Sequence, residues 1–105
     1  MGILPPKRLY YTSDALTHLK SFYDHIAQRN PNAAANVIER VRADASRLRD
    51  FPQIGHAGLA GGTYEWVVDG LPYVIVYQLW PENWDIADQL LILAVFHCKQ
   101  RGRPH

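Results

Sequence analysis

The sequence predicts an α+β domain of order β-α-α-β-β-β, an antiparallel sheet with an N-terminal helical hairpin packed on one face. Three observations support this fold. Two helical patterns follow each other directly, a strong hairpin signal comes next, and the last strands are apolar on both faces. The chain of 105 residues is expected to form a single domain, with flexible ends at about residues 1–6 and 99–105.

The first half of the chain predicts one strand and two helices. Lys7 to Tyr11 alternates as a strand does, and Ser13 can N-cap a helix that has Asp14 in its first turn. This helix should end near Arg29, and Asn30-Pro31 is a well-formed start signal for the next one. Apolar residues recur at helical spacing and form one shared stripe: Leu16, Leu19, Phe22, Tyr23 and Ile26, then Ala34, Val37, Ile38, Val41, Ala45 and Leu48.

The second half predicts a hairpin with a tight turn at Asp69-Gly70. The strand before the turn alternates and places Glu65 on a solvent-exposed face. Tyr73 to Tyr77 and Leu90 to Phe96 are apolar on both faces, which is typical of strands in the middle of a sheet. Two helices cover only one face, so the pattern leaves open whether the tail and loops or a partner protein cover the other. The loop over residues 81–89 is long enough to influence the choice of target.

Composition narrows the class of protein. The chain has 11 Lys and Arg against 10 Asp and Glu, which argues against a broad attraction to nucleic acid or acidic membranes. The single Cys98 excludes an internal disulfide and suits a reducing cytosol. His18, His25 and His56 lack metal-ligand spacing, and no cofactor is expected. With no signal peptide or membrane-spanning run in the sequence, we expect a cytoplasmic protein.

In order and spacing, the motifs resemble the RelE/ParE superfamily, the small toxins of type II toxin–antitoxin modules that are also called plasmid stabilisation proteins. The resemblance covers about Leu9 to His97. It implies a cognate antitoxin whose extended, partly helical C-terminal segment wraps the toxin. The matching features are Asn30-Pro31 with Ala33-Ala34, Leu48-x-x-Phe51-Pro52-x-x-Gly55, Gly62-Thr63-x-Glu65 with Val67-Val68, the run Pro72-Tyr73-Val74-Ile75-Val76-Tyr77, and Ile92-Leu93-x-Val95-x-His97.

The superfamily has two branches with different targets. RelE-like members cleave mRNA on the ribosome, whereas ParE-like members inhibit DNA gyrase. Metal-free RNA cleavage needs a base, an acid and a cation beside the developing phosphorane charge. In RelE-like nucleases an arginine on the strand equivalent to Tyr73–Tyr77 supplies that cation, and the alignment places Val74 there. The resemblance therefore favours a ParE-like, gyrase-inhibiting binding protein over an enzyme.

Two alternatives stay open at this point. The first is a ribosome-dependent mRNA endonuclease that uses His97 and Glu65 together with cations of the tail. Each residue also has a plain structural interpretation, because a histidine at a strand end or a glutamate on a solvated strand face is common. The second is a non-toxic, antitoxin-binding co-regulator of its own operon.

The resemblance also suggests which residues contact partners. On the second helix, four arginines in two flanking pairs could frame an antitoxin groove or simply pair with Glu39, Asp44 or Asp50 nearby. Three aromatic residues could contact the antitoxin or pack in the core. We expect a hetero-oligomer with the antitoxin, and the sequence leaves open whether the toxin also dimerises. The candidate antitoxin-binding residues are Arg40, Arg42, Arg47, Arg49, Trp66, Tyr73 and Tyr77; the candidate target-binding residues are His97, Lys99, Arg101 and Arg103.

Overall fold

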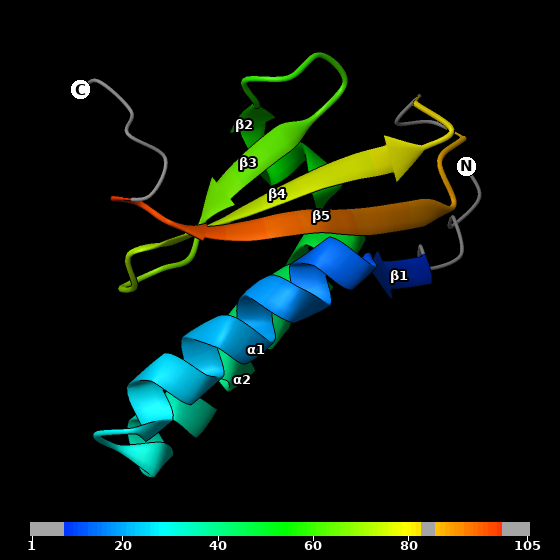
Figure 1. Ribbon diagram of the computed structural model, residues 1–105. Helices are drawn as coiled ribbons and strands as arrows, with labels where there is room; N and C mark the ends of the chain where they lie inside the picture. The colour runs from blue at the N-terminus through cyan, green and yellow to red at the C-terminus, as the bar shows by residue number, and fades with distance from the viewer. Residues whose placement is uncertain (1–7, 83–85, 100–105) are drawn as a thin grey trace.

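The computed structural model describes residues 8–82 and 86–99, and it has the predicted α+β architecture (Figure 1). Two helices and a five-stranded sheet make up most of this part of the chain, and a single 3-10 turn follows the second helix. The elements are β1 (Arg8–Tyr11), α1 (Ser13–Ala27), α2 (Pro31–Asp50), η1 (Pro52–Ile54), β2 (His56–Ala57), β3 (Tyr64–Val67), β4 (Tyr73–Trp80) and β5 (Gln89–His97).

The sheet is mixed, with strand order β1-β5-β4-β3-β2. β5, β4, β3 and β2 pair in antiparallel fashion, but β1 runs parallel to β5, so the expectation of a purely antiparallel sheet is wrong at that edge. Because no hairpin joins β1 to β5, no turn motif in the sequence indicates their relative direction. The strand β2 was also not predicted, because two residues in a glycine-rich connector are too few to show an alternating pattern.

Both α-helices begin at, or within one residue of, the position that the sequence predicts. Asn30 caps α2 as predicted, with its Oδ1 accepting the Ala33 N–H at 3.0 Å. The cap of α1 is Thr12 rather than the predicted Ser13: its Oγ1 accepts the Ala15 N–H at 3.2 Å. The same hydroxyl donates to the carbonyl oxygen of Leu93 at 3.0 Å, so the cap also ties the start of α1 to β5.

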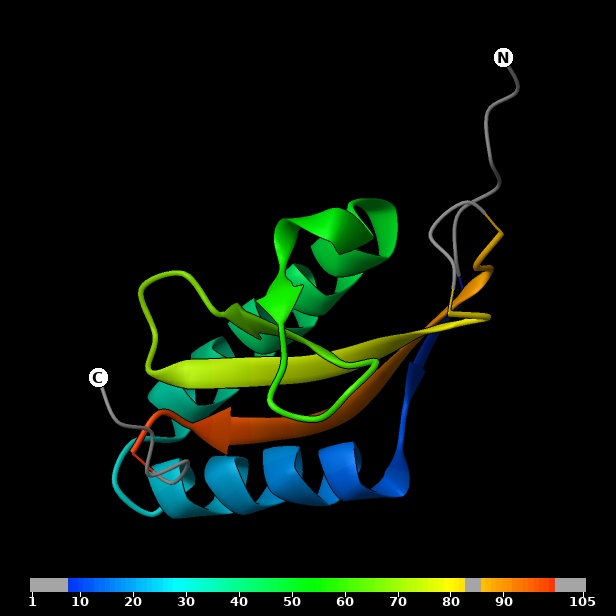
Figure 2. The same cartoon turned by 90° about the horizontal axis from the view of Figure 1, so that it is seen from above.

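The two helices cover different parts of the sheet (Figures 1 and 2). α2 lies across one face, while α1 runs along β5, its main contact in the sheet. β1 pairs only with the first part of β5, and α1 covers the edge beyond it. There the Val95 N–H donates to His18 Nδ1 at 3.2 Å, and the His18 ring lies 5.2 Å from that of Phe96. A helix thus protects an edge that could otherwise pair with another chain.

The strand β4 is buried on both faces, as predicted for a central strand. Tyr73, Ile75 and Tyr77 face the helices and belong to the main core. On the second face Val74 and Val76 are only 2% and 8% exposed. The connection over residues 58–63 lies beside this face, because Leu59 and Ala60 line a cavity together with Val76. The chain itself therefore covers part of the second face.

The predicted hairpin is present, with a longer connection than a two-residue turn. β3 ends at Val67 and β4 begins at Tyr73. Between them the Val68 carbonyl accepts the Leu71 N–H at 3.1 Å, and Gly70 has φ +74° at the third position of this turn, where glycine is preferred. Neither of the two described α-helices is long and apolar enough to cross a membrane.

Candidate functional site

The four arginines of α2 lie on two flanks of the helix, as the sequence predicts. Arg40 Nη2 donates to the Asp69 carbonyl oxygen in the β3–β4 connection. On the same flank the Arg47 guanidinium lies 5.7 Å from the centre of the Trp66 ring. On the other flank the Arg42 guanidinium lies 5.9 Å from the centre of the Tyr11 ring. Arg49 Nε lies 3.4 Å from Asp50 Oδ1.

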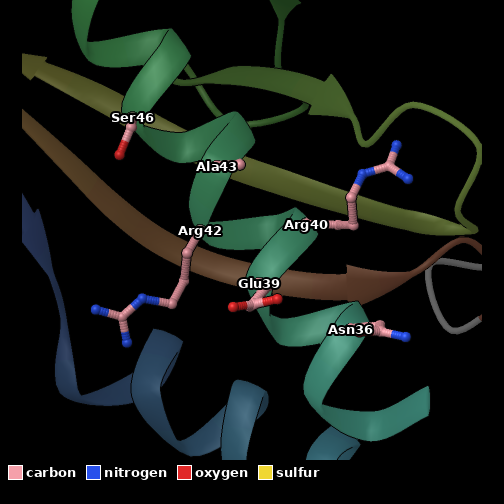
Figure 3. A pocket seen from close by; sticks show the side chains of 6 residues that line it. All are labelled: Asn36, Glu39, Arg40, Arg42, Ala43 and Ser46. Atoms are coloured by element: carbon pink, nitrogen blue, oxygen red, sulfur yellow. The ribbon is translucent and has the colours of Figure 1, made fainter. Parts of the chain in front are cut away.

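The outer face of α2 carries a shallow hollow of about 730 Å³. Figure 3 shows Arg40 and Arg42 extending to opposite sides of the helix, with the Glu39 carboxylate between them. The two guanidinium groups can meet acidic groups of a partner, while Glu39 restricts where such groups can lie. The residues that line the hollow are Asn36, Glu39, Arg40, Arg42, Ala43 and Ser46.

The inner face of α2 is joined to β3 by the buried carboxylate of Asp44. Trp66 Nε1 donates to Asp44 Oδ2 at 2.9 Å, and the Asp69 N–H donates to the same oxygen at 3.4 Å. From the sequence, Asp44 is expected only as a surface partner for the arginines. A signal was present, because Asp44 follows Val41 by three residues and precedes Leu48 by four, inside the apolar stripe. Trp66 is half-buried, so part of its ring still faces solvent.

Tyr77 and Tyr73, two of the residues predicted to contact an antitoxin, are buried in this chain. The Tyr77 hydroxyl donates to the Pro52 carbonyl at 2.7 Å and accepts the Gly55 N–H at 3.1 Å, and the side chain is fully buried. Burial raises the pKa of Tyr77 to about 12, although the Gly55 N–H acts in the opposite direction. Tyr73 is also buried and packs against Phe22 with ring centres 4.9 Å apart. Both residues hold the core together.

Gly55 allows the Tyr77 hydroxyl to come this close. A Cβ atom at position 55 would lie 2.1 Å from the Tyr77 hydroxyl oxygen and 2.9 Å from the Glu65 carbonyl oxygen. The contact explains why the chain has a glycine at this point, directly after η1.

The expectation that Glu65 lies on a solvated face is wrong. Its alternation in β3 does direct it to the second face of the sheet, where its backbone partner in β4 is Val76. The connection over residues 58–63 lies at this point, and Glu65 is completely buried. Its Oε2 accepts the Leu59 N–H at 3.3 Å. The alternation pattern could not reveal this, because a loop contributed by a neighbouring segment covers the residue.

His97 and Glu65 lie on opposite faces of the sheet, so they do not form the acid–base pair considered for a nuclease. His97 is opposite Tyr73, with ring centres 5.4 Å apart, and Tyr73 faces the helices. The Lys99 N–H donates to His97 Nδ1 at 3.1 Å. Val74 is opposite Phe96 on the second face and is buried there. The position where the nuclease branch needs a cation is therefore occupied by an apolar, buried side chain.

The basic C-terminal residues are only partly described. Lys99 is exposed, whereas Arg101 and Arg103 lie outside the described residues. Over residues 8–82 and 86–99, no group of three or more His, Cys, Asp or Glu side chains is placed to hold a metal ion.

A family model described as "ParE toxin of type II toxin-antitoxin system, parDE" matches residues 9–102 of this chain. A protein from Sinorhizobium fredii named "Putative toxin Y4kP" is 32% identical over 95 residues, which cover 90% of this chain and 92% of that protein. The match therefore spans both proteins almost completely.

Solved structures of two toxin–antitoxin systems are similar to this chain. A chain of the chromosomal ParDE system from P. aeruginosa superposes with a TM-score of 0.74 at 16% identity, covering 88% of this chain and 96% of that one. A chain of the RelBE2 toxin–antitoxin complex from Mycobacterium tuberculosis gives a TM-score of 0.55 at 22% identity, covering 89% and 99%. At these identities the likeness is one of fold.

Proposed function

Because the chain belongs to the ParE toxin family of type II toxin–antitoxin systems, we propose that it inhibits DNA gyrase in the cytoplasm and is held inactive by a cognate antitoxin. The observation that supports gyrase over RNA cleavage is Val74, which is 2% exposed and packed opposite Phe96. A buried valine cannot stabilise the charge of a phosphorane. The chain then acts by binding its target, without chemistry of its own.

The outer face of α2 is the proposed antitoxin surface. Arg40, Arg42 and Arg47 are exposed, and Arg40 and Arg42 line the hollow on the outer face of α2. An extended or helical antitoxin segment with acidic residues would complement them, and the exposed part of Trp66 would add an apolar contact. Arg49 at the end of α2 belongs to the same proposed surface. The ring contacts of Arg42 and Arg47 and the ion pair of Arg49 are weak surface interactions that a partner can replace.

The C-terminal end of β5 is the proposed gyrase-binding region. His97 ends the strand and Lys99 follows it, with Arg101 and Arg103 further along the chain. The proposal rests on charge: these are the cations grouped at one end of an otherwise balanced sequence.

The decisive experiment is a DNA gyrase supercoiling assay with toxin separated from its co-expressed antitoxin and refolded. We expect inhibition by the wild-type chain, relieved when the antitoxin is added back. Replacing Lys99, Arg101 and Arg103 with Gln should weaken inhibition at least tenfold. The matched control is Lys20→Gln, which removes an exposed lysine that pairs with Asp24 on α1.

Other outcomes would point to the two alternatives. Unaffected supercoiling at high toxin concentration, combined with mRNA cleavage in a translating extract, would replace gyrase with the ribosome as the target. In that case His97→Ala should abolish cleavage if His97 takes part in the chemistry. Normal growth after induction without antitoxin would instead indicate a non-toxic co-regulator.

A further inference from the structure

In the described part of the chain, β1 is the last strand on its side of the sheet and pairs with β5 alone (Figure 1). The N–H groups of Arg8 and Thr12 donate to carbonyl oxygens in or next to β5, at 2.7 and 3.0 Å. Main-chain groups alternate in direction along a strand, so the N–H and C=O groups of Leu9 and Tyr11 point away from the sheet. They form an outer edge that can accept another strand.

The other edges of the sheet are protected by the chain itself. Beyond β1, the edge of β5 is covered by α1, and the Val95 N–H donates to His18 Nδ1. At the opposite side of the sheet β2 is only two residues long, and beyond it the Asp69 N–H donates to the Asp44 carboxylate. Short edge strands and covering helices are common ways to prevent pairing with another chain. Within residues 8–82 and 86–99, no hydrogen bond of this kind reaches the outer edge of β1.

The outer edge of β1 is complementary to an antiparallel copy of itself. When the Tyr10 residues of two copies lie opposite each other, Leu9 of each copy is opposite Tyr11 of the other. Each of these two pairs can exchange both of its N–H···O=C bonds, because the groups involved all point outward. The Tyr10 residues form the non-hydrogen-bonded pair between them, with Cα atoms ~4.5 Å apart and side chains in contact.

Tyr10 offers apolar surface for this contact. Its neighbours Leu9 and Tyr11 pack against the main core, so Tyr10 lies on the second face of the sheet, where its side chain is 44% exposed. Its partner in β5 is Leu91, which is half-buried on the same face. Packing the two Tyr10 rings against each other removes aromatic surface from water.

Charge complementarity favours a second copy of this chain over an unrelated strand. Arg8 and Asp14 are both exposed, and neither forms an ion pair with another described residue. In the antiparallel arrangement Arg8 lies opposite Thr12 of the second copy, and Asp14 follows two residues later in the first turn of α1. The two-fold symmetry repeats this pairing of opposite charges at the other end of the strands.

We propose that the outer edge of β1 pairs with the same edge of a second copy, so that two five-stranded sheets become continuous across a two-fold axis. The interaction requires neither antitoxin nor gyrase. It uses a different part of the chain from the proposed antitoxin surface on α2 and from the proposed gyrase-binding region at the end of β5.

The first test is sedimentation velocity of the full chain, separated from its antitoxin and refolded, over a range of concentrations. We expect an equilibrium between one and two chains. Tyr10→Lys places like charges opposite each other at the two-fold axis and should weaken the dimer at least tenfold. The matched control is Tyr23→Lys, because Tyr23 is 40% exposed on α1, and it should leave the dimer unchanged. A monomer at every concentration, or a dimer that Tyr10→Lys does not weaken, would overturn the proposal.

A charge exchange tests the register of the two strands. Arg8→Glu and Asp14→Lys should each weaken the dimer at least threefold, because each places like charges near each other. The double variant should regain wild-type dimerisation, since the pair forms again with its charges exchanged. A double variant that is weaker than both single variants would contradict this arrangement.

Amide hydrogen exchange, followed by NMR on the ¹⁵N-labelled full chain, identifies the strand that covers the edge. Protection of the Leu9 and Tyr11 amides should rise with the concentration of the chain. The Tyr10 amide faces β5 and is the internal control, whose protection should stay constant. Protection of Leu9 and Tyr11 that appears only after the antitoxin is added would assign the edge to the antitoxin and overturn the proposal. None of these measurements involves gyrase, so their failure is distinct from a failure of the proposed function.

Discussion

Two carboxylates are buried on opposite sides of β3, and they differ in what surrounds them. Asp44 lies between α2 and β3 and accepts hydrogen bonds from Trp66 Nε1 and the Asp69 N–H. Glu65 lies on the other face, accepts the Leu59 N–H and lines a cavity. Both are less than a tenth exposed, so burial alone does not distinguish them.

The two carboxylates differ in the contacts they make on their faces of the sheet. The contacts of Asp44 join a helix to a hairpin that is more than twenty residues away in the sequence. Glu65 is completely buried and lines the cavity on the second face. Removing a buried carboxylate that is the shared acceptor of two donors is expected to cost more stability than changing one whose replacement can still accept its hydrogen bond. The following experiments test that distinction.

The largest loss of stability is expected for Asp44→Ala. The substitution leaves the Trp66 N–H and the Asp69 N–H without their shared acceptor, at a cost of about 3 kcal/mol in the free energy of unfolding. Urea denaturation followed by tryptophan fluorescence measures it. Asp50→Ala is the control, because Asp50 is exposed at the end of the same helix and pairs with Arg49 in a surface contact. Similar losses in both variants would refute the structural role of Asp44.

Tyr77 extends the comparison to a neutral group on the Asp44 side of the sheet. Its pKa is about 12, against an unfolded value of about 10, so the folded state binds the proton more tightly. Stability is therefore complete below pH 10 and is lost as pH rises from 10 to 12, by roughly 2.5 kcal/mol at the upper end. Burial also raises the pKa values of Tyr11 and Tyr73, which adds to the loss in the same direction.

Tyr77→Phe isolates this contribution. The variant should start less stable, because the Pro52 carbonyl and the Gly55 N–H lose their partner, and its stability should then fall less steeply between pH 10 and pH 12. Denaturant midpoints measured across this range provide the test. An unchanged slope in the variant would mean that Tyr77 does not titrate as described.

The fold was predictable where local chemistry determines it. Asn30 and Pro31 mark the start of α2, and the apolar run from Tyr73 to Tyr77 identifies the central strand. The direction of β1 was not predictable, because pairing between strands at opposite ends of the chain depends on tertiary packing. The cap of α1 was misplaced by one residue, since Thr12 and Ser13 offer the same chemistry and only the backbone geometry separates them.

The candidate site was predictable in part, for a similar reason. Periodicity placed the arginines on the correct flanks of α2 and assigned Glu65 to the correct face of β3. It could not show that residues 58–63 lie over Glu65, or that the Tyr77 hydroxyl meets Gly55. These contacts join segments whose relative position is fixed only when the whole sheet has formed.

A smaller effect is expected for the other carboxylate. Glu65→Gln keeps an oxygen that can accept the Leu59 N–H, so we expect the free energy of unfolding to fall by less than about 1 kcal/mol. The same urea denaturation used for Asp44 measures it. If Glu65→Gln lowers the free energy of unfolding as much as Asp44→Ala does, the two carboxylates do not differ and Glu65 belongs to the structural core.

The smallest effect concerns Arg47, which lies over the Trp66 ring beside Asp44. A cation over an exposed part of an aromatic ring contributes about 0.5–1 kcal/mol, and a double-mutant cycle with Arg47→Gln and Trp66→Leu should recover that coupling. The control cycle replaces Arg47 with Arg42, which lies on the other flank over Tyr11 and should couple to Trp66 by less than ~0.5 kcal/mol. Because the Arg47 contact is weak, an antitoxin can displace it at little cost, whereas the bond between Trp66 and Asp44 stays in place. Strong coupling of Arg47 to Trp66 would make this arginine part of the structural side and remove it from the proposed antitoxin surface.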